Sequence, residues 1–183
     1  MATRLFQIAL ISKIDEEKAP WFNYQAKNII TYTLWEHLVP IAIAAGGFIP
    51  GPSWSLSAAQ LQAHDVVVHF VMDPSSSIAR RAGVSRNEGP NAGGLTAPTS
   101  GGVVCEVYVD GNMPARRLAN IAFHEIMHIK LDVGARVITD LHTKGGGGLA
   151  TPPTNEWTPL TARNVELMAA NLFRKVPQYT KAM

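Results

Sequence analysis

One short motif constrains this chain more than any other stretch of its sequence. His124 and His128 lie four residues apart, with Glu125 directly after the first histidine, in a segment with helical periodicity. Residues four apart lie one turn above each other on the same face of a helix, so both imidazoles can bind one metal ion. A glutamate beside the first histidine is placed to accept a proton from a water molecule on that ion. The motif therefore predicts a metal site with Glu125 as general base.

The motif occupies the middle of a predicted helix over residues 114–133. Pro114 suits the first turn of a helix, and Gly134 suits the left-handed residue that follows the last turn. Apolar residues recur at spacings of three and four along a face that the histidines do not share: Leu118, Ala122, Ile126, Ile129 and Val133. Such a helix packs one side into a core and presents ligands from the other, as the floor of a cleft requires.

The whole sequence, residues 1–183, predicts a single α+β domain with a small mixed sheet, a long first helix, a central metal-binding helix and a C-terminal helix. Apolar runs rich in β-branched residues predict strands over residues 5–12, 65–72 and 103–109. We expect the last of these strands to border the cleft as an edge strand. Residues 73–102 are rich in Gly, Pro, Ser and Asn, which indicates a functional loop, a mobile flap or short strands.

Three further helices are predicted along the chain. The first covers residues 21–45, with a kink or restart at Pro40, and a short one covers residues 58–63 with Ser57 as its N-cap. The last helix is expected to follow Thr158 as N-cap and to end at the proline at position 177. Pro159 would then occupy its first turn.

Composition excludes several classes of protein. The net charge of +2 is too small to indicate a nucleic-acid partner. Cys105 is the single cysteine, which excludes an intrachain disulfide and limits thiolate ligands to one sulfur. Gln7 interrupts the N-terminal apolar run and no small-x-small site follows, so no cleavable signal peptide is expected. No apolar run reaches a membrane-spanning length. We therefore expect a soluble protein without membrane insertion, either cytoplasmic or exported by a route that needs no signal peptide.

The motif resembles that of the zincin superfamily of zinc metallopeptidases. This resemblance implies a bound Zn²⁺ with three protein ligands and one open position for water. The order of elements is similar to the metzincin-like branch, but the full metzincin motif is absent. Leu131 stands where that motif has glycine, Gly134 stands where it has a third ligand, and the next methionine is Met168.

Four residues are candidates for the third ligand. His142 follows Gly134 by eight residues, in a segment that can turn back, and imidazole is a preferred zinc donor, so it is favoured. Glu166 lies on the C-terminal helix, as in the glutamate branch of zincins, and Glu156 is a weaker version of the same idea. Asp132 lies two turns, about 12 Å of axial rise, from His124 and is disfavoured.

Other residues carry weaker predictions. Asp140 could orient the imidazole of His142. The four glycines 145–148 indicate either a bare flexible loop or backbone that approaches the metal closely. Candidates for stabilising an oxyanion are Tyr108, Tyr179, Arg136 and Arg163. Among the remaining histidines, His37 and His64 are expected at the surface or at helix caps, and His69 in the core.

These observations favour a zinc-dependent endopeptidase in which His124, His128 and His142 hold the ion and Glu125 moves the proton. Two alternatives stay open: a peptidoglycan amide hydrolase, and a zinc-stabilised binding module without activity. In size and motif the chain is similar to metallopeptidase toxin domains of bacterial contractile secretion systems. That similarity implies a protein or peptide substrate, and a secretion-machine carrier or an immunity protein as partner.

Overall fold

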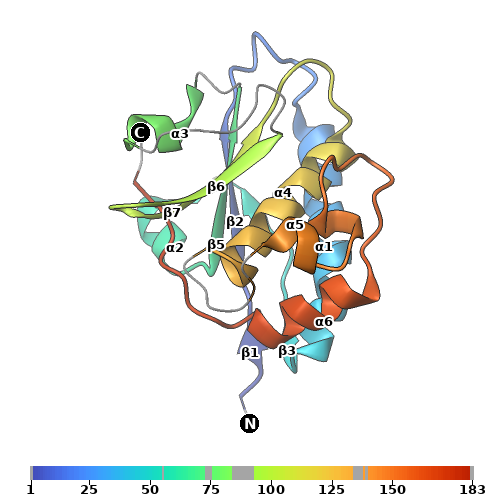
Figure 1. Ribbon diagram of the computed structural model, residues 1–183. Helices are drawn as coiled ribbons and strands as arrows, with labels where there is room; N and C mark the ends of the chain where they lie inside the picture. Colours follow the sequence, from blue (N-terminus) through green and yellow to red (C-terminus); the bar gives the residue numbers. More distant parts are fainter. Residues whose placement is uncertain are drawn as a thin grey trace.

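A computed structural model describes residues 2–54, 56–72, 76–83, 93–133, 138 and 140–181 (Figure 1). The named elements follow one another along the chain in this order: β1 Arg4–Leu5, β2 Ile8–Lys13, α1 Tyr24–Ala44, β3 Gly47–Phe48, β4 Ser53–Trp54, α2 Ala58–Gln62, β5 Val66–Val71, α3 Ile78–Arg81, β6 Gly94–Thr99, β7 Gly102–Tyr108, α4 Ala115–Leu131, α5 Leu141–Lys144, the 3₁₀ turn η2 Gly148–Ala150, and α6 Ala162–Asn171.

In the described part of the chain, five strands form one sheet in the order β4-β2-β5-β7-β6. β4, β2, β5 and β7 run parallel, and β6 runs antiparallel to β7. The short strands β1 and β3 pair separately. The predicted α+β class, with a mixed sheet and a long first helix, is confirmed. The strand predicted over residues 5–12 is divided into β1 and β2, and between them the backbone N–H of Gln7 donates to the side chain of Asp65.

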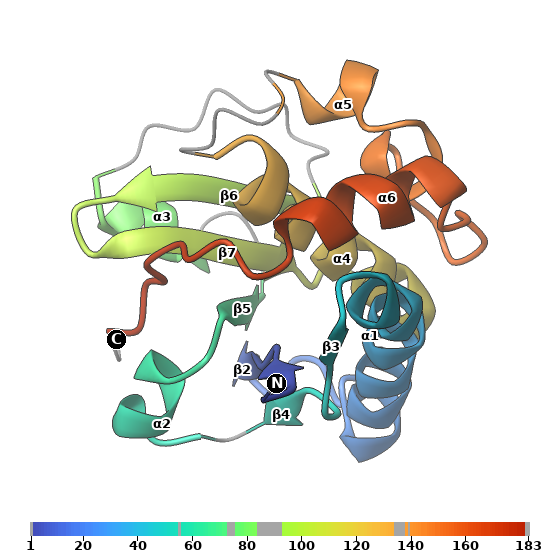
Figure 2. The ribbon, with the colours of Figure 1, turned by 90° about the horizontal axis from the view of Figure 1, so that it is seen from below.

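Both faces of the sheet are covered. Figure 2 shows α1, α4 and α6 on one face, and α2 and α3 on the other. Every residue of β5 is buried, as expected for a central parallel strand between two layers. The larger core lies on the α1–α4–α6 face, and two smaller clusters join the opposite face to α2 and α3.

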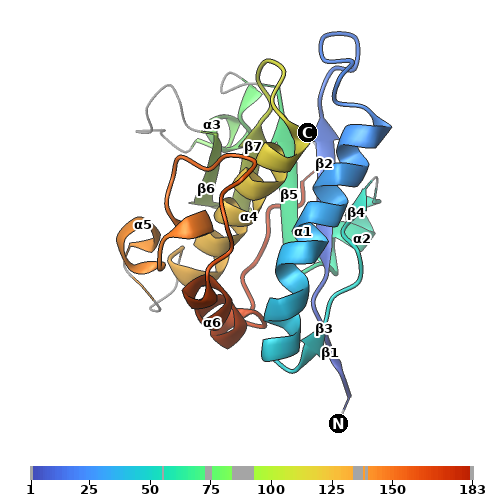
Figure 3. The same cartoon turned by 90° about the vertical axis from the view of Figure 1, so that its right-hand side faces the viewer.

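Helix α1 runs without interruption through Pro40, so the predicted restart there is wrong. The proline has no N–H, so the carbonyl four residues before it loses one intrahelical partner, but the helix still continues to Ala44. The side chain of Asn23 accepts a hydrogen bond from Ala26 N at the start, and Gly46 adopts a positive φ of 70° after the end. Figure 3 shows α1 lying beside α4 along much of its length.

The stretch predicted as a functional loop, a mobile flap or short strands, residues 73–102, contains α3 and the strand β6, so the alternative of short strands describes part of it. The position of β6 could not be predicted because Gly94 and Pro98 are poor strand formers. Pro98 is tolerated since β6 is the edge of the sheet, where a missing N–H breaks no ladder on the outer side. This arrangement also corrects the prediction that β7 is an edge strand, because β7 lies between β5 and β6.

The C-terminal helix also begins later than predicted. The hydroxyl of Thr161, not Thr158, accepts the capping hydrogen bond from Asn164 N, and the Asn164 side chain accepts one from Thr161 N. Thr158 instead accepts a hydrogen bond from Asn155 N in the preceding turn. The carbonyl of Pro159 accepts a hydrogen bond from Leu149 N, so this proline precedes the helix and contacts the turn η2, which packs against α4.

Helix α4 is buried on more than the one face that its apolar stripe predicts. The stripe residues Leu118, Ala122, Ile126 and Ile129 are fully buried, and so are Phe123 and Met127. The helix packs against α1, α6 and the β6–β7 hairpin. Gly134, the predicted end cap, lies outside the described residues. None of the helices in the described ranges combines the length and apolar character that a membrane span requires.

Candidate metal centre

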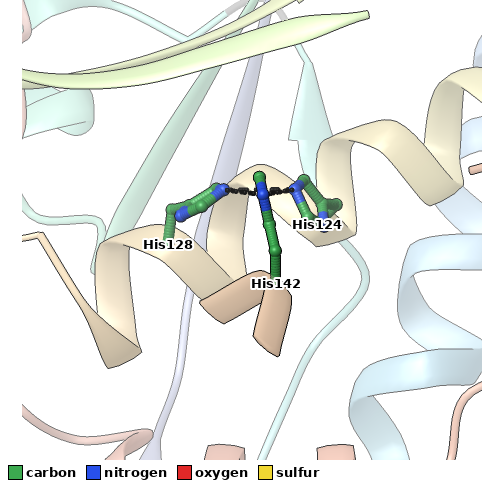
Figure 4. A group of neighbouring side chains, drawn as sticks. All are labelled: His124, His128 and His142. Carbon is green, nitrogen blue, oxygen red and sulfur yellow. Dashed lines mark hydrogen bonds between the residues drawn. The ribbon is translucent and has the colours of Figure 1, made fainter. Parts of the chain in front are cut away.

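Three histidines converge on one point. His124 and His128 come from successive turns of α4, and His142 comes from the single turn of α5 (Figure 4). The Nε2 atoms of His124 and His128 lie 3.1 Å apart, and the Nε2 atom of His142 lies 3.2 Å from each of them. His124 is buried, His128 half-buried and His142 exposed, so the group opens toward solvent on the side of α5.

Asp132 connects two of these histidines. Its carboxylate oxygens accept a hydrogen bond from His128 Nδ1 at 2.9 and 3.0 Å. One of them also accepts a bond from Leu141 N at 3.3 Å, at the first residue of the helix that carries His142. Asp132 is not a member of the donor group found among the described residues; it contacts the ring of one histidine of that group and the start of the helix that bears another.

Asp140 does not orient His142 in the way predicted. Its carboxylate accepts hydrogen bonds from His142 backbone N and from the Thr143 hydroxyl, at 3.0 and 2.8 Å. These bonds, led by the one from Thr143, lower the pKa of Asp140. An aspartate before a short helix satisfies free N–H groups of the first turn, so Asp140 acts as the N-cap of α5.

The glycine run after His142 brings a backbone carbonyl to the site. His124 Nδ1 donates to Leu149 O at 2.7 Å. An added Cβ at Gly148 would collide with Pro159 O, and Gly146, Gly147 and Gly148 all have positive φ. These positions therefore require glycine, and the prediction of a close backbone approach to the site describes the run better than that of a bare flexible loop.

A side chain from α6 fixes this glycine run. Asn164 is fully buried, and its amide nitrogen donates to Gly145 O at 2.7 Å and to Gly147 O at 3.1 Å. The same residue forms the capping box with Thr161. Asn164 therefore joins the start of α6 to the turn that supplies the carbonyl partner of His124.

The hydrogen-bond partners decide which ring nitrogens face the centre. A carbonyl and a carboxylate can only accept, so the Nδ1 atoms of His124 and His128 carry protons. The pKa of His124 is lowered to about 4, mainly by burial and further by the neighbouring imidazoles, and this favours its neutral ring. When both rings are neutral, their Nε2 lone pairs face each other at 3.1 Å with no proton between them. A cation at the centre relieves this repulsion.

The distances fit a zinc ion. Three nitrogens around a tetrahedral zinc, at the usual Zn–N distance of about 2.0–2.1 Å, lie roughly 3.3 Å from one another. The observed separations of 3.1–3.2 Å are close to this value. Among the described residues, the donor group has three members, all of them histidines. The three histidines are the residues predicted as ligands.

The other candidate ligands have different partners. The carboxylate of Glu166 accepts a hydrogen bond from Arg163 at 2.7 Å, with both side chains half-exposed or more. Glu156 lies before α6, where its backbone carbonyl accepts a bond from Arg116. Neither glutamate belongs to the donor group found among the described residues.

Glu125 lies between α4 and the edge strand. It is only 5% exposed, and its Oε2 atom accepts a hydrogen bond from the Thr96 hydroxyl at 2.7 Å. The same hydroxyl lies 3.0 Å from the backbone carbonyl of Glu125. The predicted base is thus a buried carboxylate, adjacent in sequence to a histidine of the cluster and hydrogen-bonded to β6.

Most of the predicted oxyanion stabilisers lie elsewhere. Tyr108 and Tyr179 belong to the cluster on the opposite face of the sheet. Arg163 contacts Glu166, and Arg136 lies outside the described residues. The structure therefore brings neither tyrosine to the three histidines.

The remaining histidines divide as follows. His69 is buried in the core as predicted, and His64 Nδ1 lies 2.7 Å from Gln60 O at the end of α2, as expected for a capping residue. His37 is buried rather than at the surface, with its Nε2 atom 2.8 Å from Asn120 Oδ1, and burial lowers its pKa. The prediction for His37 was wrong because α4 packs directly onto α1.

Sequence reasoning missed several partners of the site. The contact of Asp132 with His128 could have been predicted, because a residue four positions after His128 on a helix lies beside its ring. The contacts of Leu149, Thr96 and Asn164 could not, since tertiary packing alone brings Leu149 to His124, Thr96 to Glu125 and Asn164 to the glycine run. No protein-family model matches the chain, and no curated protein matches it either, so its function must be inferred from its own residues.

Proposed function

We propose that this chain is a zinc-dependent endopeptidase. The observation that supports the proposal is the convergence of three imidazole Nε2 atoms on one point, with a buried carboxylate next in sequence to one of them. Three protein ligands are typical of a catalytic zinc, whereas a structural zinc normally has four. The presence of Glu125 favours hydrolysis further, because a structural site needs ligands and no base.

The roles follow from the contacts. His124, His128 and His142 would hold the ion, with Leu149 O and Asp132 orienting two of the rings. Zinc in this position would supply Lewis acidity, which polarises a carbonyl and acidifies a water molecule. Glu125 accepts the proton of the attacking water and delivers it to the leaving amine. The exposed side of His142 leaves the site open to a protein segment.

The test is cleavage of an unfolded protein, fluorescently labelled casein, by zinc-loaded protein. The variant Glu125→Gln keeps the shape of the side chain but cannot accept a proton. We expect it to bind one zinc per chain and to lose activity by at least the 10²–10⁴-fold that general-base catalysis contributes. Glu166→Gln, on the surface of α6, is the matched control and should cleave at the wild-type rate.

The other outcomes would either overturn the mechanism or support a different function. Cleavage by Glu125→Gln at the wild-type rate would overturn the mechanism. Zinc binding with hydrolysis of peptidoglycan but not of casein would identify an amide hydrolase. Zinc binding with no hydrolysis of either substrate would support a binding module. The similarity to secretion-system toxin domains stays a prediction that rests on size and motif.

A further inference from the structure

The edge strand β6 contacts Glu125 at two alternate positions. Gly94 and Thr96 both lie on the face of β6 that meets α4, whereas Leu95 and Ala97 pack on the opposite face with α3. Residues two apart on a strand share a face. The carboxylate of Glu125 therefore lies against a short, defined patch of one strand.

At the first position, a missing side chain makes room. An added Cβ at Gly94 would lie 2.8 Å from both Cγ and Oε1 of Glu125, and 2.7 Å from Glu106 O on the neighbouring strand. A Cβ atom does not approach other non-bonded heavy atoms this closely. Any residue other than glycine would therefore displace the strand or the carboxylate.

At the second position, a hydroxyl fixes the carboxylate. The Thr96 hydroxyl carries one proton and lies 2.7 Å from Oε2 but 3.0 Å from the backbone carbonyl of the same residue. A hydrogen bond to an ionised carboxylate is shorter and stronger than one to a carbonyl, so the proton goes to Oε2.

A third side chain of the hairpin, that of Cys105, lies beside Thr96. Cys105 of β7 is the register partner of Thr96 and is fully buried. Burial raises the pKa of its thiol, the charge of Glu125 raises it further, and a hydrogen bond with Thr96 partly offsets this, so the thiol lies near both side chains.

We propose that Thr96 is a positioning residue for the general base: its hydroxyl, beside the gap left by Gly94, holds the carboxylate of Glu125 in the orientation that proton transfer requires. This inference rests on the proposed function. A general base must lie within hydrogen-bond reach of the proton it takes, and a misplacement of about 1 Å can cost on the order of 100-fold in rate. The hydroxyl fixes one carboxylate oxygen and so reduces the rotamer freedom of the side chain.

The test compares three substitutions in zinc-loaded protein with labelled casein as substrate. Thr96→Val keeps the shape and removes the donor, and we expect kcat to fall between about 10- and 100-fold. KM and zinc content should stay within about twofold of wild type, because neither ligand nor substrate contact is removed. Thr96→Ser restores the donor and should recover most of the rate.

Thr99→Val is the matched control on the same strand. The Thr99 hydroxyl donates to Gly102 O and accepts from Gly101 N within the hairpin turn, so its loss affects stability and not kcat. If Thr96→Val does not fold, Thr96→Ala, which is smaller, carries the same expectation. The double variant Thr96→Val with Glu125→Gln should be no slower than Glu125→Gln alone, since the first change acts only through the second residue.

Three results would overturn the inference: wild-type kcat in Thr96→Val or Thr96→Ala, equal losses in the valine and serine variants, or a loss that follows zinc content. Failure of the proposed function is distinguishable from these. If Glu125→Gln cleaves normally, the base itself is wrong, whereas an inactive Glu125→Gln beside a fully active Thr96→Val removes only the role of Thr96.

Discussion

Two buried histidines, one on each face of the sheet, have the same electrostatic character. His124 on the α4 face and His69 on the α3 face are both buried, both contact a backbone carbonyl, and both have a pKa lowered to about 4, mainly by burial. They differ at the second ring nitrogen. That of His124 meets the Nε2 atoms of His128 and His142, whereas Nδ1 of His69 has no hydrogen-bond partner among the described residues.

The comparison shows that burial and a shifted pKa do not by themselves identify a metal site. Both properties follow from removing an imidazole from water, and any core histidine acquires them. Convergence of several lone pairs on one point is the distinguishing feature, because only a cation or a proton can occupy that point. Substitutions at and around the three-histidine site, and at His69, should therefore have different effects.

The largest effect is expected from loss of a ligand. His142→Ala should weaken zinc binding by more than the roughly 10–100-fold that loss of an outer partner costs, because one of three donors disappears. His69→Gln should bind zinc as wild type does. A competition titration with a chromogenic chelator measures both zinc affinities. Equal affinities in the two variants would show that His142 contributes no more to zinc binding than His69 does.

A smaller effect is expected from loss of Asp132. Asp132→Ala removes the acceptor of His128 Nδ1 and the anchor of Leu141 N. Loss of such a partner costs about 10–100-fold in metal affinity, so the same titration should give a value between wild type and His142→Ala. Unchanged affinity would show that the imidazole needs no external orientation.

On the opposite face, His69 predicts a pH dependence of stability. Burial lowers its pKa to about 4, the bond to Tyr179 O partly offsets this, and the charge of Lys13 lowers it further. Glu106, its neighbour on β7, has its carboxylate occupied by Ser77, Ile78 N and Ala79 N. The folded state thus favours the neutral ring.

The sign follows from proton binding. The unfolded state binds a proton near pH 6.5 and the folded state only near pH 4, so this contribution is fully present above pH 6.5 and is lost as the pH falls toward 4. Between pH 7.5 and pH 5 the loss is on the order of 2 kcal/mol. Urea unfolding in chelator should show that His69→Gln loses less stability than wild type over this range. Parallel curves for the two proteins would contradict the assignment.

The smallest effect is expected at Glu166, a rival third ligand in the sequence. Its ion pair with Arg163 is half-exposed or more, and such pairs contribute little. Glu166→Gln should therefore change zinc affinity less than about twofold in the chelator titration. A clear loss of affinity would mean that α6 supplies a ligand in solution.

The sequence predicted the parts of this molecule that local patterns determine. Helix α4, the buried strand β5 and the capping of α2 by Ser57 follow from periodicity, β-branched runs and a capping box. The two histidines of α4 follow from the geometry of a helix, and His142 was favoured because a chain leaving that helix can turn back.

The parts that escaped prediction depend on contacts distant in sequence. Strand β6 contains glycine and proline and is stabilised by pairing with β7, so its own residues carry no strand pattern. The partners of the site come from the hairpin, the glycine turn and α6, which meet only after folding. His37 was misplaced for the same reason, since its burial depends on how α1 and α4 pack.

A crystal grown with zinc and measured at the zinc absorption edge tests the proposed three-histidine site most directly. We expect one anomalous peak about 2.0–2.1 Å from the Nε2 atoms of His124, His128 and His142, with no fourth side chain on the ion. A structure without a peak among these three nitrogens, or one in which a fourth protein ligand closes the site, would contradict it.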